Sequence, residues 1–187
     1  DAGTVTFGGE DVTHLPVHAR ALKNLTRSFQ ITQVLPGFTT LENVAIAAQA
    51  HDGSSFRFFR PASAERRLNE TAMAALDQVG LAARAASPAA SLSHGEKRQL
   101  EIALALVSEP KLLLLDEPMA GMGREETERM VEVLLALKGR YPMVLVEHDM
   151  HAVFRLADRI SVLVYGRVIA SGLPDAVRAD PAVREAY

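Results

Sequence analysis

The sequence contains no cysteine, which excludes disulfide bonds and cysteine-based zinc or redox sites. It also has no apolar run near the roughly 18 residues that a membrane-spanning helix requires. Neither sign of charge dominates: the net charge of −3 gives no general electrostatic reason to bind nucleic acid. The remaining composition, 48% hydrophobic over 187 residues, is typical of a globular domain with a sizeable core.

The C-terminal half alternates apolar runs with helical spacing. Residues 112–115 are a continuous apolar run, as expected of a parallel strand buried on both faces, and residues 143–146 predict a second buried strand. Apolar residues at helical spacing predict a helix before these runs, one between them and one after them. A further strand over residues 160–164 then turns at Tyr165-Gly166 into a last strand over residues 168–170. This alternation predicts an α/β domain with a mainly parallel sheet.

Residues 31–91 have a different character, with no convincing strand. Leu41, Val44 and Ala48 follow helical spacing, and a second apolar face runs over residues 68–79 to a C-cap at Gly80. We therefore expect a helical lobe inserted into a sheet-based domain. A loop-like insert over residues 51–61 carries a cluster of phenylalanines and arginines, which we interpret as a protein contact or an anchored loop rather than a nucleic-acid or membrane patch.

The sequence begins with a predicted strand that has no helix or strand before it. Residues 4–7 predict a strand, Gly8-Gly9 a tight turn, residues 16–23 a short helix, and residues 26–30 a strand that ends on Gln30. Because a strand begins at once after Asp1, we expect a structural piece of the domain to lie upstream. The alternative is a processed or trimmed start.

The stretch Ser93-His94-Gly95-Glu96 has the spacing of a capping box, with Ser93 as the N-cap and Glu96 three residues later. The same geometry leaves backbone N–H groups and the positive end of a helix dipole available to an anion. Gly95 removes a side chain that would hold a phosphate away. Both roles, a structural cap and a phosphate contact, are compatible.

Asp116 and Glu117 follow four leucines, where an unpaired buried charge would cost several kcal/mol. A metal ion offsets that cost, so we predict that Asp116 holds Mg²⁺ and Glu117 polarises an attacking water. The alternative is a carboxylate pair at a solvent-facing strand end. His148 follows the next apolar run and should reach the same sheet edge, where it could hydrogen-bond a terminal phosphate or serve as a structural histidine.

These elements, in this order, resemble the nucleotide-binding subunit of ATP-binding cassette (ABC) transporters. The matching segments are the Q-loop at Gln30, the signature motif at 92–99, the Walker B strand and catalytic glutamate at 112–117, the D-loop at 119–123 and the switch histidine at His148. The signature variant Leu-Ser-His-Gly-Glu-Lys-Arg, the opening Phe-Gly-Gly-Glu-Asp-Val-Thr-His-Leu-Pro, the segment Thr-Leu-Glu-Asn-Val and the ending Asp-Pro-Ala-Val-Arg-Glu-Ala-Tyr are similar to the branched-chain amino acid importer ATPases.

The resemblance implies an α/β P-loop NTPase fold of ABC type, with a mainly parallel sheet and an inserted helical subdomain. It divides the chain into the remaining N-terminal part of the core up to the Q-loop (1–30), the helical subdomain (31–91), and the signature helix with the RecA-like core and the C-terminal strands and helix (92–187). Two departures stand out. The Walker A loop, Gly-x-x-x-x-Gly-Lys-Ser/Thr, is absent, and Gly123 occupies a D-loop position where Asp or Asn is usual.

The implied function is that of an ATP-hydrolysing importer subunit that uses ATP and Mg²⁺. By the resemblance, Glu117, His148 and Gln30 are catalytic, Asp116 and Gln30 serve Mg²⁺, and the signature residues Ser93, Gly95 and Glu96 contact the ATP of a partner. The implied partners are a second ATPase subunit, identical or paralogous, and membrane permease subunits, but no nucleic acid. The implied location is the cytoplasmic face of the membrane, as a peripheral subunit.

Without the Walker A loop, we expect this chain alone to be inactive. The alternative is a non-hydrolysing regulatory or docking module that lacks the phosphate loop. A third possibility, an ABC-type ATPase of DNA repair or translation, is disfavoured by the transport-like helical lobe and the acidic balance.

Overall fold

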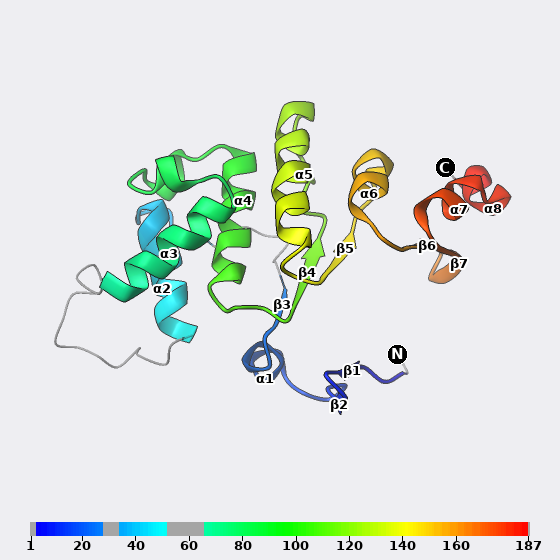
Figure 1. The fold of residues 1–187 in the computed structure, drawn as a ribbon, viewed down its shortest axis with the longest axis horizontal. Helices are drawn as coiled ribbons and strands as arrows, with labels where there is room; N and C mark the ends of the chain where they lie inside the picture. Colours follow the sequence, from blue (N-terminus) through cyan, green and yellow to red (C-terminus); the bar gives the residue numbers. More distant parts are fainter. Residues whose placement is uncertain (1–2, 28–33, 52–65, 187) are drawn as a thin grey trace.

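A parallel sheet of three strands lies at the centre of the computed structural model, which describes residues 3–27, 34–51 and 66–186. The strands are β3 (Leu25–Arg27), β4 (Leu112–Asp116) and β5 (Met143–Val146), and β4 lies between the other two (Figure 1). Both pairings are parallel. The predicted α/β class with a parallel sheet is therefore confirmed.

The main core lies between one face of this sheet and four helices. They are α2 (Thr40–His51), α3 (Arg66–Gln78), α4 (His94–Leu106) and α5 (Arg124–Lys138). Leu113 and Leu115 of β4 are fully buried against side chains such as Leu100 of α4 and Leu134 of α5. In Figure 1, α2, α3 and α4 lie on one side of α5, and the C-terminal elements lie on the other.

The prediction that both apolar runs are fully buried strands is wrong. Strand β5 alternates between partly buried and exposed positions, and Val144 and Val146 are 50% and 56% exposed. In β4, Leu113 and Leu115 are buried, whereas Leu112 and Leu114 are only partly buried. The reason is that the main core packs on one face of the described sheet, so alternate side chains of both strands point away from it.

Between β3 and β4 the described residues form helices and belong to none of the named strands, with two short 3₁₀ helices, η2 (Ala82–Arg84) and η3 (Ala89–Ser91), after α3. The amide of Asn43, 4% exposed, fixes the entry to α2 because its Oδ1 accepts from Leu35 N–H at 2.7 Å and its Nδ2 donates to the carbonyls of Leu35 and Thr39. The predicted C-cap at Gly80 has φ +76°. The Phe/Arg cluster over residues 56–60 and Gln30 lie outside the described residues.

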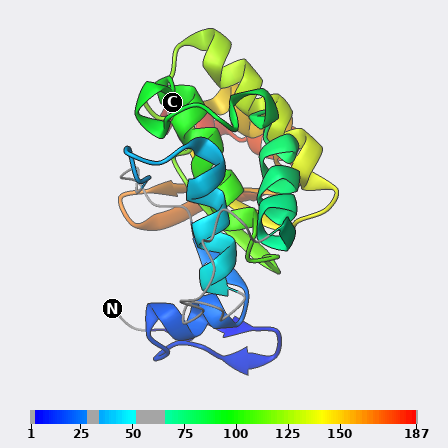
Figure 2. The same ribbon diagram turned by 90° about the vertical axis from the view of Figure 1, so that its left-hand side faces the viewer.

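Two small units flank the central body. Near the N-terminus, Gly8 and Gly9 have positive φ and turn β1 (Thr6–Phe7) into β2 (Glu10–Asp11), followed by α1 (Val17–Leu22). After β5 come α6 (Met150–Leu156), the antiparallel strands β6 (Ile160–Val164) and β7 (Arg167–Gly172), α7 (Pro174–Ala179) and α8 (Pro181–Ala186). Figure 2 shows the N-terminal unit below the helices, at the far end from the top of α5.

The C-terminal elements have a core of their own. Val162 of β6, Val177 of α7 and Val183 of α8 are buried together in it. The guanidinium of Arg178 lies over the ring of Phe154, 4.2 Å from its centroid, and so joins α7 to α6. The C-terminal unit is therefore anchored to the central domain through α6.

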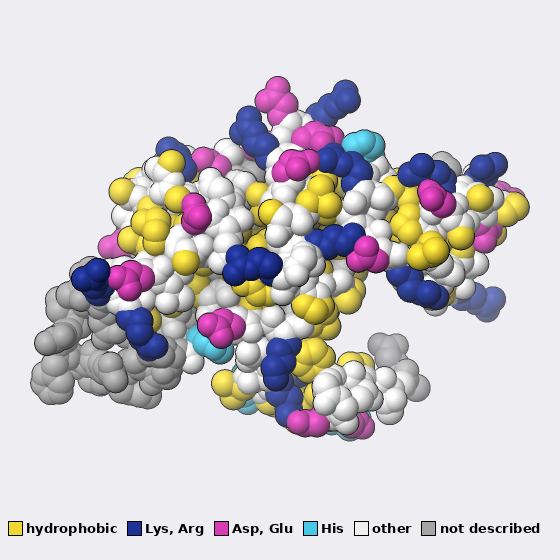
Figure 3. All heavy atoms as spheres, in the orientation of Figure 1, with side chains coloured by type: hydrophobic (Ala, Val, Ile, Leu, Met, Phe, Trp, Pro, Cys, Tyr) yellow, Lys and Arg dark blue, Asp and Glu magenta, His cyan; other side chains and the backbone are white. Residues whose placement is uncertain are grey.

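On the face drawn in Figure 3, basic and acidic side chains are interspersed rather than gathered by sign. None of the helices in the described part of the chain combines the length and the apolar character needed to cross a membrane.

The central strand provides a test of this packing. Leu113→Ala removes a side chain with no exposed surface from the core of β4, so we expect it to lower the free energy of unfolding by about 2–5 kcal/mol. The matched control is Leu163→Ala in β6, where the side chain is 63% exposed and the loss should be well under about 1 kcal/mol. Urea unfolding midpoints of the two variants measure the difference, and equal midpoints would contradict the assignment of Leu113 to the core.

Candidate functional site

Acidic side chains and a histidine meet at the carboxyl edge of the sheet. Asp116 ends β4 opposite Val146, which ends β5. His148 follows β5, and its Nδ1 lies 3.8 Å from Oε1 of Glu117. The structure thus brings Glu117 and His148 together at the carboxyl ends of two neighbouring parallel strands, the edge where the sequence predicted them. The side chain of His148 is 72% exposed, so this edge faces solvent.

The backbone at Glu117 is held in an uncommon conformation. Its φ of 46° lies in the left-handed region, which residues other than glycine rarely adopt. The N–H of Glu117 donates to the Val146 carbonyl at 2.9 Å, and its own carbonyl accepts from Ala120 N–H at 3.1 Å. Strained residues of this kind persist only where their surroundings hold them, and they cluster at functional sites. The sharp turn after β4 therefore fixes the backbone position, beside β5, from which the Glu117 side chain extends.

Asp116 has a basic partner that the sequence did not reveal. Oδ2 of Asp116 forms an ion pair with the guanidinium of Arg27 at 2.8 Å, across the β3–β4 pairing. The Arg27 side chain is 63% exposed, so solvent screens the pair and its contribution to stability is small. The carboxylate predicted to hold a metal ion thus also has a positive counter-charge within the chain.

The residues at this edge fit a Mg²⁺ ion that takes a single carboxylate ligand from the described part of the protein. Within the described residues, no group of three or more His, Asp or Glu side chains is arranged to hold a metal ion. Magnesium, however, is usually held by one or two carboxylates and completes its shell with water and substrate phosphates. A single partly exposed carboxylate, Asp116, matches that pattern. Gln30, the other predicted Mg²⁺ contact, lies outside the described residues.

Glu147 is a residue whose role the sequence did not indicate. Its side chain is only 1% exposed, and its carboxylate accepts from Met119 N–H at 2.9 Å and from His148 N–H at 3.1 Å. A buried carboxylate that accepts backbone N–H groups is well satisfied. Glu147 therefore fixes the start of segment 119–123 against the end of β5. Its position directly after an apolar strand was the available signal.

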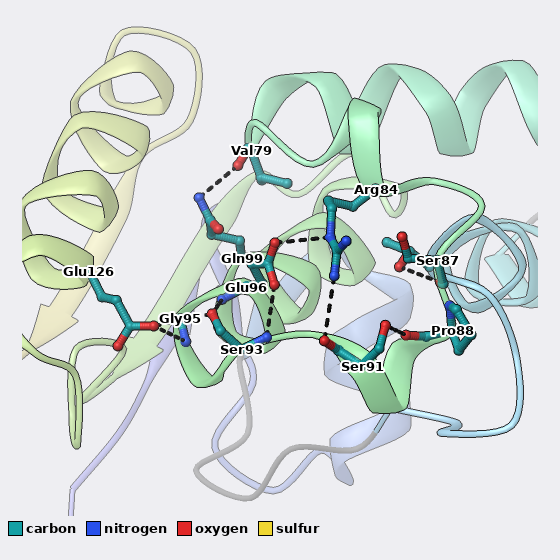
Figure 4. Close-up of polar contacts among 11 residues, drawn as sticks. Val79, Arg84, Ser87, Pro88, Ser91, Ser93, Gly95, Glu96, Gln99 and Glu126 are labelled. Atoms are coloured by element: carbon teal, nitrogen blue, oxygen red, sulfur yellow. Dashed lines mark hydrogen bonds and ion pairs between the residues drawn. The ribbon is translucent and has the colours of Figure 1, made fainter.

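The second half of the predicted site, Ser93 to Glu96, begins α4 as a capping box. Ser93 Oγ accepts from Glu96 N–H at 3.2 Å, and Glu96 Oε2 accepts from Ser93 N–H at 2.8 Å (Figure 4). The other oxygen of Glu96 forms an ion pair with Arg84 at 3.1 Å. Both oxygens of Glu96 are thus engaged by groups of its own chain, and the carboxylate holds the loop in shape.

A carboxylate from another helix covers this helix start. Oε1 of Glu126, in the first turn of α5, accepts from Gly95 N–H at 3.2 Å and from the Ser93 hydroxyl at 3.1 Å (Figure 4). Oε2 of the same side chain accepts from Gly123 N–H at 3.4 Å. The Gly95 and Gly123 amides, and then the Ser93 hydroxyl, lower the pKa of Glu126 below its usual range. The sequence did not indicate Glu126, because α5 had no predicted position relative to α4.

The two halves of the site are also joined through His94. Its Nε2 lies 3.0 Å from the carbonyl oxygen of Ala120. Gly121, with φ +76°, leaves room for this contact, because a Cβ there would lie 3.3 Å from the same ring nitrogen. The helix start at Ser93 and the carboxylate edge at Glu117 are therefore separate places connected by residues 119–126.

Comparison with known protein families gives two matches along the chain. A model of the ABC transporter family matches residues 1–120. A second model, described as branched-chain amino acid ATP-binding cassette transporter, matches residues 167–187. Together they cover Asp116 and Glu117, the start of α4, and helices α7 and α8, whereas His148 lies between the two matched ranges.

Individual relatives agree with these models. The high-affinity branched-chain amino acid transport ATP-binding protein BraF of Pseudomonas aeruginosa is 34% identical over 99% of this chain and 75% of its own length. The probable branched-chain amino acid transport ATP-binding protein LivG of Archaeoglobus fulgidus is 35% identical over 100% of this chain and 74% of its own length. The chain thus spans about three quarters of the length of these relatives.

A solved structure supports the same assignment. The ATP-binding cassette MJ1267 of an ABC transporter, in its ADP conformation, superposes with a TM-score of 0.83 at 28% identity, over 99% of this chain and 76% of that chain. On the family models, the relatives and this superposition, the chain belongs to the ATP-binding proteins of ABC transporters, and among them to the branched-chain amino acid importer type.

Proposed function

We propose that the complete protein hydrolyses ATP to drive the import of branched-chain amino acids or similar solutes. The observation that carries this proposal is the convergence of Glu117 and His148, 3.8 Å apart, beside Asp116 at the carboxyl edge of the sheet. Glu117 polarises the attacking water, and His148 hydrogen-bonds the terminal phosphate. Gln30 contacts the metal ion and the water from the Q-loop.

Asp116 is the residue that would hold Mg²⁺, directly or through water. Bound there, the ion would neutralise charge on the phosphoryl group that is transferred. Arg27 is 63% exposed, so its side chain is free to turn toward solvent when Asp116 takes up this role. Asp116 and Glu117 then have different tasks on consecutive residues, Asp116 as the last residue of β4 and Glu117 in the sharp turn that follows.

The start of α4 serves a different nucleotide in this proposal. Two ATPase subunits, identical or paralogous, close head to tail, and Ser93 and Gly95 contact the phosphate of the ATP held by the partner. Glu96 supports this contact through the capping box, because it fixes the backbone of Ser93. The two halves of each subunit thus belong to two different ATP sites.

The proposed partners and location follow from the type of transporter. The relatives are named as transport ATP-binding proteins for branched-chain amino acids, and we propose the same solute class here. Permease subunits would span the membrane, and this chain would dock on them from the cytoplasmic face through the helical lobe. The helical lobe, residues 31–91, and the core on either side of it are the corresponding domains.

The second candidate is a non-hydrolysing docking or regulatory module. It is favoured by one observation: Ser93 and Gly95 lie at the start of α4, whereas Asp116 and Glu117 lie at the end of β4. The half of the site that faces the partner therefore does not need a phosphate loop in the same chain. The loop Gly-x-x-x-x-Gly-Lys-Ser/Thr is absent from the 187 residues. In either case we propose that these residues alone do not turn over ATP.

ATP hydrolysis by two chains separates these candidates. We expect the 187-residue chain to show no ATPase activity above background, because it has no loop to hold its own phosphates. A longer chain that carries the phosphate loop ahead of Asp1 should hydrolyse ATP when the permease is present. Phosphate release is the measurement, and an inactive longer chain would instead support the docking module.

Glu117→Gln in the longer chain tests the proposed general base. The amide keeps the size of the side chain but cannot polarise water, so we expect kcat to fall about 10²- to 10⁴-fold while ATP still binds. Glu185→Gln, at an exposed position in α8, is the matched control and should leave kcat unchanged. ATP binding is followed by equilibrium dialysis. A variant with undiminished turnover would remove Glu117 from this role.

A further inference from the structure

The donors proposed for the partner's ATP are already engaged by a carboxylate. Oε1 of Glu126 accepts hydrogen bonds from both Gly95 N–H and the Ser93 hydroxyl, at 3.2 and 3.1 Å (Figure 4). A carboxylate oxygen and a phosphate oxygen are both anionic acceptors that use the same kind of donor. Glu126 therefore sits where the proposed function requires a phosphate.

The position of Glu126 is favoured by two helix starts at once. Glu126 lies in the first turn of α5, where a negative charge is stabilised by the helix dipole, and it reaches the first turn of α4. Its second oxygen accepts from Gly123 N–H, which has no side chain of its own to cap α5. The carboxylate thus bridges the signature motif and the end of the D-loop.

The carboxyl group of Glu126 occupies the space directly beside Gly95. An added Cβ on Gly95 would lie 3.0 Å from Oε1 and 3.1 Å from Cδ of Glu126, so the carboxyl group fills the space that a glycine leaves open. A phosphate oxygen that bonds to Gly95 N–H and Ser93 Oγ must therefore displace Oε1. Two like charges in contact would also repel each other.

We infer that Glu126 is an internal competitor of the partner's ATP at the signature motif and must swing away before the two subunits close on the nucleotide. This inference rests on the proposed function of Ser93 and Gly95. The displaced side chain can keep its bond to Gly123 through Oε2. It also has a new partner within reach, since Arg129 lies three residues further along α5 and lines the same small pocket as Glu126 and Gly95.

The consequence is a threshold for ATP. In the open subunit, Glu126 already accepts hydrogen bonds from the Ser93 and Gly95 donors. When the partner's ATP replaces Glu126, the net gain in binding free energy is only the difference between the contacts of the phosphate and those of Glu126. Removing the charge of Glu126 should therefore lower the ATP concentration that closes the dimer, with little change in the chemical step.

The experiment uses the longer chain in a Glu117→Gln background, where ATP binds without turnover, and measures ATP-dependent dimerisation by light scattering. With Glu126→Gln, we expect half-maximal dimerisation at an ATP concentration about three- to tenfold lower, because a charge-assisted hydrogen bond is replaced by a neutral one. Glu185→Gln, at an exposed position in α8 far along the chain, removes one negative charge as well; it is the matched control and should not shift the midpoint.

A second variant separates contact from charge. Glu126→Asp keeps the charge, but its side chain is one methylene shorter and should not reach Gly95, so competition for the donors predicts a lower ATP midpoint here as well. In the background with an intact Glu117, Glu126→Gln should lower KM for ATP while kcat changes less than about twofold. A thermal melt of each variant shows whether it is folded, and Glu126→Asp decides the outcome if Glu126→Gln is not.

Two controls keep this test distinct from that of the proposed function. If the unaltered longer chain does not dimerise with ATP, or if Ser93→Ala does not weaken its dimerisation, the proposed function fails. If both behave as proposed but Glu126→Gln leaves the midpoint unchanged or raises it, Glu126 supports the signature motif rather than competing at it, and the inference is overturned.

Discussion

The parallel pairing of β4 with β5 is the constraint on which the site depends. Its register sets Asp116 opposite Val146, so both strands end at the same level of the sheet. The next residue continues the pairing through Glu117 N–H to the Val146 carbonyl, in a left-handed conformation. A slip of one residue would move every side chain of β4 to the other face and would carry Glu117 away from His148.

The buried face of β4 secures that register. Leu113 and Leu115 are fixed in the core between the helices, and only the alternate positions of the strand can face outward. Glu117 lies directly after this rigid strand, on a loop that the buried side chain of Met119 anchors in the main core. Glu147 adds a second restraint, because its buried carboxylate ties the Met119 backbone to the end of β5. Rigid strands followed by short, hydrogen-bonded loops are a common way to position catalytic groups.

Local patterns in the sequence predicted the elements of this fold well. The capping box at Ser93, the tight turn at Gly8-Gly9 and the sheet edge at Glu117 and His148 all depend on residues near one another in the chain or on the rule that parallel strands end at one edge. The burial of β4 and β5 was predicted wrongly, since an apolar run alone does not show whether one face of a strand is covered or both are.

Contacts between distant elements could not be predicted from the sequence. The pairs Arg27 with Asp116 and Glu126 with Gly95 join residues on separate elements, and they depend on how strands align and how α5 lies against α4. The order of charges along the sequence does not indicate such pairs. Each carboxylate could pair with many basic side chains or backbone N–H groups, and only the fold selects one of them. The catalytic, metal-binding and nucleotide-binding roles of the site residues, Gln30 among them, remain predictions, as do the domain boundaries.

Glu147 links two parts of the molecule that act on different nucleotides in the proposed function. Its two oxygens hold the backbone at Met119, which leads into the D-loop, and at His148, which faces Glu117. Because one buried group contacts both, we expect a displacement of the histidine loop to move the D-loop as well, and Ala120 of the D-loop contacts His94 in the signature motif. The bond network therefore forms a short mechanical linkage, within a single subunit, between its own terminal-phosphate contact and its contact with the neighbouring one.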